Sequence, residues 1–197
     1  MKSDTLRLDH SVILEIVEQG SRVLDLGCGD GSLIELLANE KNARVQGIEF
    51  ADEQIYKCVA RGISVFHGDI DTGLSEYPDQ SFDYVILNQS LQEVVKVEFV
   101  LAEALRVAKK VIVGFSNFAY YKARIDIFFH GKAPVTESLP NSWYSTPNLH
   151  FLSIRDFEEY CRHKQIAILA RYYLGEKQPV RFLPNLFALN AIFVIAK

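Results

Sequence analysis

The chain has 197 residues, 49% of them hydrophobic, which is enough for one domain with a full core. Its net charge of −4, with no basic run longer than Lys109-Lys110, argues against nucleic acid as the main partner. The polar start 1–5 leads into no signal-peptide core, and the apolar tail 187–196 is too short to span a bilayer. We therefore expect a cytoplasmic protein that does not associate with a membrane.

Three cysteines, Cys28, Cys58 and Cys161, are an odd and scattered set. They form no CxxC pair and no spacing typical of a metal site. The simple interpretation is reduced thiols in a cytosolic protein that holds no metal.

Hydrophobic periodicity predicts that helices and strands alternate through the first 116 residues. The N-terminal segment 1–19 carries the first helix. The predicted helices are 10–19, 31–40, 52–61 and 97–108, and the predicted strands are 23–26, 45–49, 64–67, 82–87 and 111–115. This alternation is typical of a parallel sheet with helices on both faces.

The last third of the chain follows another pattern. Residues 154–164 form a predicted helix, whereas 166–174 and 190–196 read as two strands joined by a loop with Pro179 and Pro184. Two closing strands with no helix between them predict an antiparallel pair. The fold class is therefore α/β, with a doubly wound, mostly parallel sheet of seven strands. One domain over 1–197 is expected.

The most specific motif is Asp25-Leu26-Gly27-Cys28-Gly29-Asp30-Gly31, placed between a predicted strand and a predicted helix. Glycines let a ligand lie against the backbone and tolerate positive φ, and free N–H groups at a helix start favour polar ligands. Such turns also occur as plain strand-to-helix connections. The G-x-G-x-G spacing differs from the G-x-G-x-x-G fingerprint of nicotinamide-binding proteins, which disfavours that class.

Polar residues end four predicted strands, and these are Asp25, Glu49, Asp69 and Asn88. Ligands of open α/β sheets bind outside the carboxyl ends of the strands. Glu49 lies 24 residues after Asp25, a position suited to accept hydrogen bonds from ribose hydroxyls. Each residue alone could be an ordinary surface residue, but together they predict a nucleoside-type cofactor site.

With these motifs, residues 20–116 resemble class I S-adenosylmethionine-dependent methyltransferases, which implies a Rossmann-like fold and S-adenosylmethionine or S-adenosylhomocysteine as cofactor. By this resemblance, the methionine part lies on Gly27, Cys28 and Gly29, with Asp25 near its amino group. Glu49, followed by Phe50, holds the ribose. Asp69 and Ile70 contact the adenine, and Asn88 borders the sulfonium.

Residues 117–153, the cap segment, separate the fifth predicted strand from the next helix and are rich in aromatic residues. A helix is predicted over 120–129. Connections this long are usually functional, although aromatic rings also pack for stability alone. The candidate substrate or partner surface comprises Tyr121, His130, Trp143, Tyr144 and His150. His130, Tyr144 and His150 are also the candidates for a catalytic base.

The cap segment makes the resemblance more specific. Residues 129–134, 139–150 and 153–157, together with 88–93 and 116–118, are similar to the methionine biosynthesis protein MetW family. The similarity covers nearly the whole chain and is weakest after Gly175. It implies a methyltransferase-like protein that acts alongside a homoserine O-acyltransferase in methionine biosynthesis.

Two functions from different classes remain open. The protein could bind the cofactor and assist or regulate the acyltransferase, which fits the lack of a catalytic signature. It could instead methylate a small molecule under the aromatic cap. The Asn-Pro-Pro-Tyr type of amine-methylating motif is absent, because Asn88-Gln89-Ser90-Leu91 stands in its place. Methyl transfer needs alignment more than a dedicated base, so this absence does not decide between them.

Overall fold

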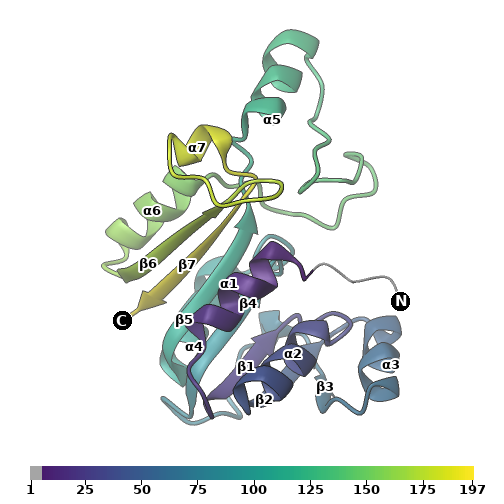
Figure 1. The fold of residues 1–197 in the computed structure, drawn as a ribbon, viewed down its shortest axis with the longest axis vertical. Coiled ribbons are helices and arrows are strands. Elements are labelled where there is room, and N and C mark those ends of the chain that lie inside the picture. The colour runs from purple at the N-terminus through teal and green to yellow at the C-terminus, as the bar shows by residue number, and fades with distance from the viewer. Residues whose placement is uncertain (1–5) are drawn as a thin grey trace.

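Seven strands form one sheet in the order β3-β2-β1-β4-β5-β7-β6 (Figure 1). The computed structural model describes residues 6–197. The strands are β1 Arg22–Leu26, β2 Arg44–Glu49, β3 Val65–His67, β4 Phe82–Asn88, β5 Ala108–Ser116, β6 Ala167–Leu174 and β7 Asn190–Ala196. The first five pair in parallel, and β7 runs antiparallel to both β5 and β6. The predicted sheet and its antiparallel closing pair are thus confirmed.

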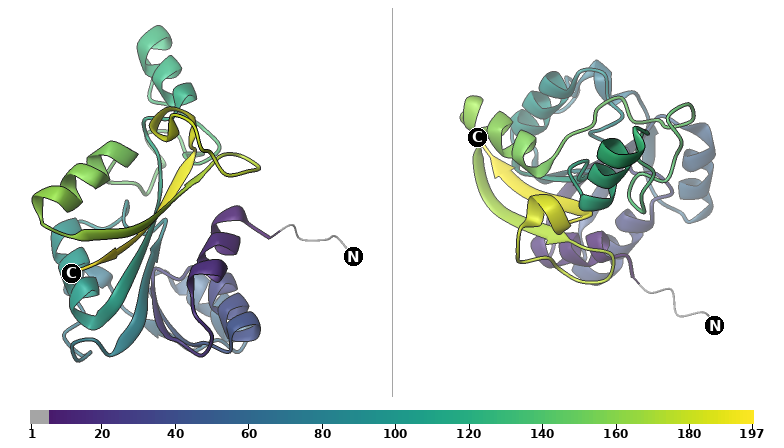
Figure 2. Two further views of the ribbon diagram at one scale, coloured as in Figure 1. Left: turned by 60° about the vertical axis from the view of Figure 1, so that its left-hand side comes forward. Right: turned by 90° about the horizontal axis from the view of Figure 1, so that it is seen from above.

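Helices cover both faces of this sheet, as Figure 2 shows. The helices are α1 Leu8–Ile16, α2 Ser32–Lys41, α3 Asp52–Ala60, α4 Val97–Val107, α5 Tyr121–Ile125, α6 Ile154–His163 and α7 Pro184–Phe187. The buried side chains of α1 and α2 pack on one face, and those of α4 and α6 pack on the other. Within residues 6–197 no helix is long and apolar enough to cross a membrane.

Successive side chains of the central strands point to opposite faces of the sheet, which explains why a hydrophobic core lies on each face. In β4, Tyr84 and Ile86 pack with α1 and α2, while Val85 and Leu87 pack with α4 and α6. All four side chains are buried, as expected for a strand covered on both faces. Strand order reverses between β1 and β4, and the carboxyl ends there form the switch point at which such sheets bind ligands.

The first helix ends at Ile16 and not at Gln19 as predicted. Val17 is already extended and fully buried, and Gly20 turns the chain into β1 with φ +71°. Glu18, which periodicity places in the helix, instead accepts a hydrogen bond from the Tyr84 hydroxyl. Residues 1–5 of the predicted N-terminal segment lie outside the described residues.

The cap segment projects beyond the carboxyl edge of the sheet (Figures 1 and 2). The helix predicted over 120–129 is present as α5, which continues as a π-helix over Asp126–His130. The rest of the segment has little regular structure, with one bridge between Thr136 and Leu139. Its end is held by Gln92, whose carbonyl oxygen accepts hydrogen bonds from the 149 and 150 backbone N–H groups.

Candidate functional site

Glycines shape the turn between β1 and α2. Gly27 and Gly29 have φ +74° and +55°, a left-handed conformation that strains other residues. A Cβ on Gly27 would lie 2.7 Å from the Cβ of Ser90, in the loop after β4. A Cβ on Gly29 would meet nothing within 4 Å. The turn therefore packs against protein at Gly27 and exposes bare backbone to open space at Gly29.

Glu49, the last residue of β2, ties this turn to the neighbouring strand. Its Oε2 accepts a hydrogen bond from the Gly29 N–H at 2.8 Å, and its Oε1 accepts from the N–H groups of Phe50 and Ala51, each at 2.8 Å. Three backbone donors thus hold the carboxylate at the end of the sheet. Oε1 already accepts two hydrogen bonds, whereas Oε2 accepts one and still has accepting capacity for a ligand hydroxyl.

Asp25, in β1, is a buried carboxyl group with an unusual environment. Only 2% of the residue is exposed, and no donor among residues 6–197 hydrogen-bonds to its side chain. Burial, followed by the nearby Glu49 charge, raises its pKa to about 7. A buried carboxylate without a counter-charge is costly, and a cationic group placed beside it would compensate for that cost.

One cavity of about 980 Å³ opens at these strand ends, and we call it the strand-end cavity. Its wall includes all nine residues expected to bind the cofactor: Asp25, Gly27, Cys28, Gly29, Glu49, Phe50, Asp69, Ile70 and Asn88. Residues separated by up to 63 positions are thus brought together, because parallel strands end at the same edge. Their individual contacts with a cofactor remain predictions.

Two of these nine residues, Asp69 and Asn88, also form hydrogen bonds within the fold. Asp69 caps the 3₁₀ turn Ile70–Thr72, since its side chain accepts a hydrogen bond from the Asp71 N–H at 2.9 Å. Asn88 donates from Nδ2 to Asp9 on α1 at 2.9 Å, while its buried Oδ1 has no partner among the described residues. Asn88 therefore anchors α1 over the switch point.

Sequence reasoning missed the contribution of α1 to this cavity. Arg7 and His10 line it, and Asp9 joins Arg7 to Asn88, with Arg7 Nη2 at 2.6 Å from Asp9 Oδ2. Burial lowers the pKa of His10, which keeps it neutral near pH 7. The signal available in the sequence was the pair of polar residues Arg7 and His10, which precede the apolar helix positions that begin at Val12.

The wall is strongly acidic. Its carboxylate residues are Asp25, Asp30, Glu49, Asp69, Asp71 and Glu93, against two cationic side chains, Arg7 and Lys57. Charge of one sign around a cleft raises the local concentration of ligands of the opposite sign. The cavity therefore favours a ligand that carries positive charge.

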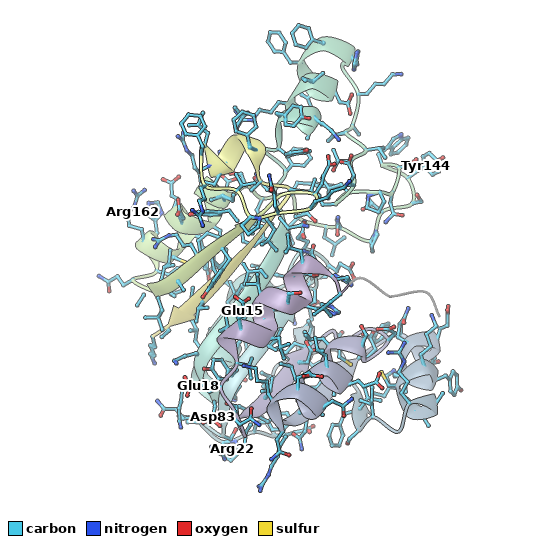
Figure 3. All side chains as sticks on the ribbon, in the orientation of Figure 1. Glu15, Glu18, Arg22, Asp83, Tyr144 and Arg162 are labelled. Carbon is cyan, nitrogen blue, oxygen red and sulfur yellow. The ribbon has the colours of Figure 1, made fainter. Side chains whose placement is uncertain are left out.

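The five residues of the expected substrate or partner surface lie elsewhere. None of Tyr121, His130, Trp143, Tyr144 and His150 lines the strand-end cavity or the second cavity beside it. Trp143 and Tyr144 are 77% and 76% exposed, and Figure 3 shows Tyr144 pointing outward. These two rings face solvent, and the role of the five residues in binding a substrate or a partner stays a prediction.

Two other members of this set, His130 and Tyr121, contact neighbouring side chains of the cap segment. His130 Nδ1 lies 3.1 Å from Asp126 Oδ1, one helical turn earlier. The Tyr121 ring packs edge-on against Tyr120 at a centroid distance of 4.7 Å. These contacts describe structural roles in the cap segment, and a catalytic role remains a prediction.

Comparisons with known proteins identify a family for this chain and agree with its fold. The family model described as methionine biosynthesis protein MetW matches residues 7–195. The bifunctional methionine biosynthesis protein MetXA/MetW of Rhodopirellula baltica is 36% identical over 190 residues, which is 92% of this chain and 30% of that protein. The chain thus spans about a third of this relative's length.

Solved structures share the fold at low sequence identity. A SAM-dependent methyltransferase from Archaeoglobus fulgidus superposes with a TM-score of 0.69 at 14% identity, covering 97% of this chain and 91% of that chain. An S-adenosylmethionine-dependent methyltransferase from Mesorhizobium loti also gives 0.69, at 16% identity, with 95% and 96% covered. This likeness shows a Rossmann-like methyltransferase fold.

Proposed function

Because the chain belongs to the MetW family of methionine biosynthesis proteins, we propose that it binds S-adenosylmethionine and acts with or regulates a homoserine O-acyltransferase. The observation that carries the cofactor proposal is the strand-end cavity, with its open glycine turn beside Glu49 and the unpaired Asp25. The protein would carry out this function in the cytoplasm.

The charges of the cofactor suit this wall. S-adenosylmethionine carries an ammonium and a sulfonium, and the wall holds more carboxylates than cationic groups. Asp25 supplies a buried counter-charge for the ammonium, and Glu49 Oε2 keeps accepting capacity for a ribose hydroxyl. Bare backbone at Gly29 leaves room for the methionine part.

Calorimetry with S-adenosylhomocysteine and with NAD tests the cofactor class. We expect binding of the former and none of the latter, because the glycine spacing and the acidic wall disfavour an anionic dinucleotide. Binding of NAD without binding of S-adenosylhomocysteine would end this proposal.

Affinity for S-adenosylhomocysteine is expected to weaken by about tenfold between pH 7.5 and pH 6, as Asp25 protonates. The free protein has an Asp25 pKa of about 7, and a bound ammonium would lower it. Below pH 7 binding must therefore expel a proton. Calorimetry at both pH values measures the effect, which Asp25→Asn should abolish and Glu93→Gln should leave in place. A flat wild-type profile would contradict the role of Asp25.

Glu49→Ala is expected to weaken cofactor binding by about 1.5–3 kcal/mol, the scale of hydrogen bonds to a charged group. The fold should survive, since the three backbone N–H groups that Glu49 binds lie at a partly exposed edge and can bind water. Glu53→Ala is the matched control, because Glu53 is exposed on α3, pairs with Lys57 and lies outside the cavity. Equal affinity in the two variants would show that Glu49 is only a turn residue.

The acyltransferase proposal rests on the relative whose single chain joins MetXA and MetW. Fusion in one chain raises the effective concentration of each protein for the other, which favours proteins that act together. Affinity capture from the native cell, with and without S-adenosylmethionine, tests the pairing. A homoserine acyltransferase in the eluate supports it, and its absence in both conditions counts against it.

Methyl transfer to a small molecule is the second candidate function. It is favoured by a second cavity that adjoins the strand-end cavity and shares Arg7, Gln89 and Glu93 with it. Incubation of the protein with labelled S-adenosylmethionine and a cell metabolite extract tests this activity. A labelled small molecule that forms only with the protein supports it.

A further inference from the structure

His10, on α1, is a buried polar side chain whose ring has no partner in the protein. The residue is 7% exposed and belongs to the wall of the strand-end cavity. Neither ring nitrogen has a hydrogen-bond partner among residues 6–197, and neither is one of the unpaired polar atoms that are closed to solvent. The ring nitrogens therefore reach the cavity, and an unpaired buried group of this kind requires an explanation.

The ring lies near the glycine turn and the start of α2. Helix α1 packs against α2 (Figure 1), and Ser32 and Leu33, the first residues of α2, share the cavity wall with His10. Asp30, in the glycine turn, and His10 each affect the pKa of the other. A helix start favours a negatively charged group, because its first N–H groups point out of the helix. An anionic group between the turn and α1 would therefore meet both the helix start and the His10 ring.

The carboxylates near His10 are already compensated. Arg7 donates to Asp9 from Nε at 3.1 Å and from Nη2 at 2.6 Å. Arg61 donates to Asp30 from Nη2 at 3.1 Å. Burial, the largest effect, lowers the pKa of His10, so the ring is neutral near pH 7 and one of its nitrogens carries a proton that it can donate. The free group at this end of the cavity is thus a neutral N–H donor.

The buried polar side chains of the wall include a matched pair. Among residues 6–197, Asp25, Ser90 and His10 are the polar side chains of this wall that are more than nine-tenths buried. Ser90 donates to the Leu26 carbonyl oxygen at 2.6 Å, whereas Asp25 and His10 have no hydrogen-bond partner. The wall therefore holds one unused acid and one unused donor. An amino-acid group carries an ammonium for the first and a carboxylate for the second.

We propose that His10 donates a ring N–H to the carboxylate at the amino-acid end of the ligand, and so makes the strand-end cavity selective for a nucleoside that carries an intact α-amino acid. The ammonium and the carboxylate of such a ligand are bonded to the same carbon, while Asp25 leads into the glycine turn and His10 lies near it. The inference rests on the proposed cofactor. It adds a selectivity that Asp25 and Glu49 do not supply, because both are carboxylates and neither would attract another.

The ligand pair that tests this selectivity is S-adenosylhomocysteine and its decarboxylated analogue, in which hydrogen replaces the α-carboxylate and the ammonium is kept. Calorimetry is run with the full chain and each ligand. We expect the wild-type chain to bind the analogue at least about tenfold more weakly. His10→Phe keeps a ring and removes the N–H, so it should weaken S-adenosylhomocysteine by about tenfold and leave the analogue unchanged. His10→Gln supplies an amide donor and should recover part of the lost affinity.

The control variant is His163→Phe, because His163 is exposed on α6, lies 3.7 Å from Glu159 and lines neither cavity. Equal weakening of both ligands in His10→Phe would overturn the inference and assign the ring a structural role. Wild-type binding of both ligands with equal affinity would overturn this inference alone, whereas binding of neither would remove the cofactor proposal as well.

Imidazole ¹⁵N spectra of the wild-type chain give a second readout that requires no variant to fold. The ring signals of His10 should move on addition of S-adenosylhomocysteine and stay in place with the decarboxylated analogue. Equal movement with the two ligands would contradict a hydrogen bond to the carboxylate.

Discussion

Gly29→Val is expected to reduce the affinity for S-adenosylhomocysteine by up to about a hundredfold. The open space in front of Gly29 is where the backbone meets the strand-end cavity, and an isopropyl group would fill it. Overlap with a bound ligand costs about 1–3 kcal/mol, and each 1.4 kcal/mol is a factor of ten in affinity. Calorimetry with the folded variant measures the loss.

The chain offers a matched control for backbone strain. Gly20, in the loop between α1 and β1, has φ +71°, and a Cβ there would also meet nothing within 4 Å. Gly20 does not line the strand-end cavity. Gly20→Val should thus lower thermal stability much as Gly29→Val does while keeping cofactor affinity. If Gly29→Val bound the cofactor as well as Gly20→Val does, the ligand could not lie on the glycine turn.

The fold and the strand-end cavity were predictable because their signals are local. Apolar periodicity marks each strand and helix, and the polar residue that ends a strand marks the edge of the sheet. Asp25 and Glu49 converge because β1 and β2 are parallel and in register, with Leu26 opposite Ile48. No knowledge of long-range contacts is needed to place them at one edge.

The contribution of α1 depends on contacts that no local pattern encodes. Asp9 and Asn88 are 79 positions apart, and their hydrogen bond decides where the helix lies over the cavity. The second cavity is also assembled from distant segments, with Gln92 bonded to Ser116 at the end of β5. Single polar residues in loops have no periodicity, so their convergence is visible only in the structure.

The sequence also does not predict which aromatic residues of the cap segment are buried. Its aromatic residues could be read as core or as surface, because a segment with little regular structure has no repeating face to compare. The structure separates them: Tyr120 is 4% exposed, whereas Phe128 is 81% exposed. Exposed aromatic side chains in a cluster are typical of surfaces that bind partners.

Changing both Trp143 and Tyr144 to Ala is expected to weaken acyltransferase binding by about a hundredfold or more, the scale expected when two interface hot spots are lost. Cofactor affinity should stay nearly the same, since neither residue lines the strand-end cavity. The melting temperature should change little, because the two rings pack edge-on against each other and are 77% and 76% exposed. Affinity capture, calorimetry and thermal unfolding of one preparation give the three readouts.

Two other exposed rings make this prediction specific. Tyr56 is 72% exposed on α3, which lies away from the cap segment in the fold (Figure 1), so Tyr56→Ala should leave partner binding intact. Phe182, in the loop between β6 and β7, is 73% exposed and represents a rival surface. If Phe182→Ala removed partner binding while the Trp143 and Tyr144 double variant kept it, the docking surface would lie on that loop. Loss of cooperative unfolding in the double variant would instead assign the two rings a role in stability, which their exposure argues against.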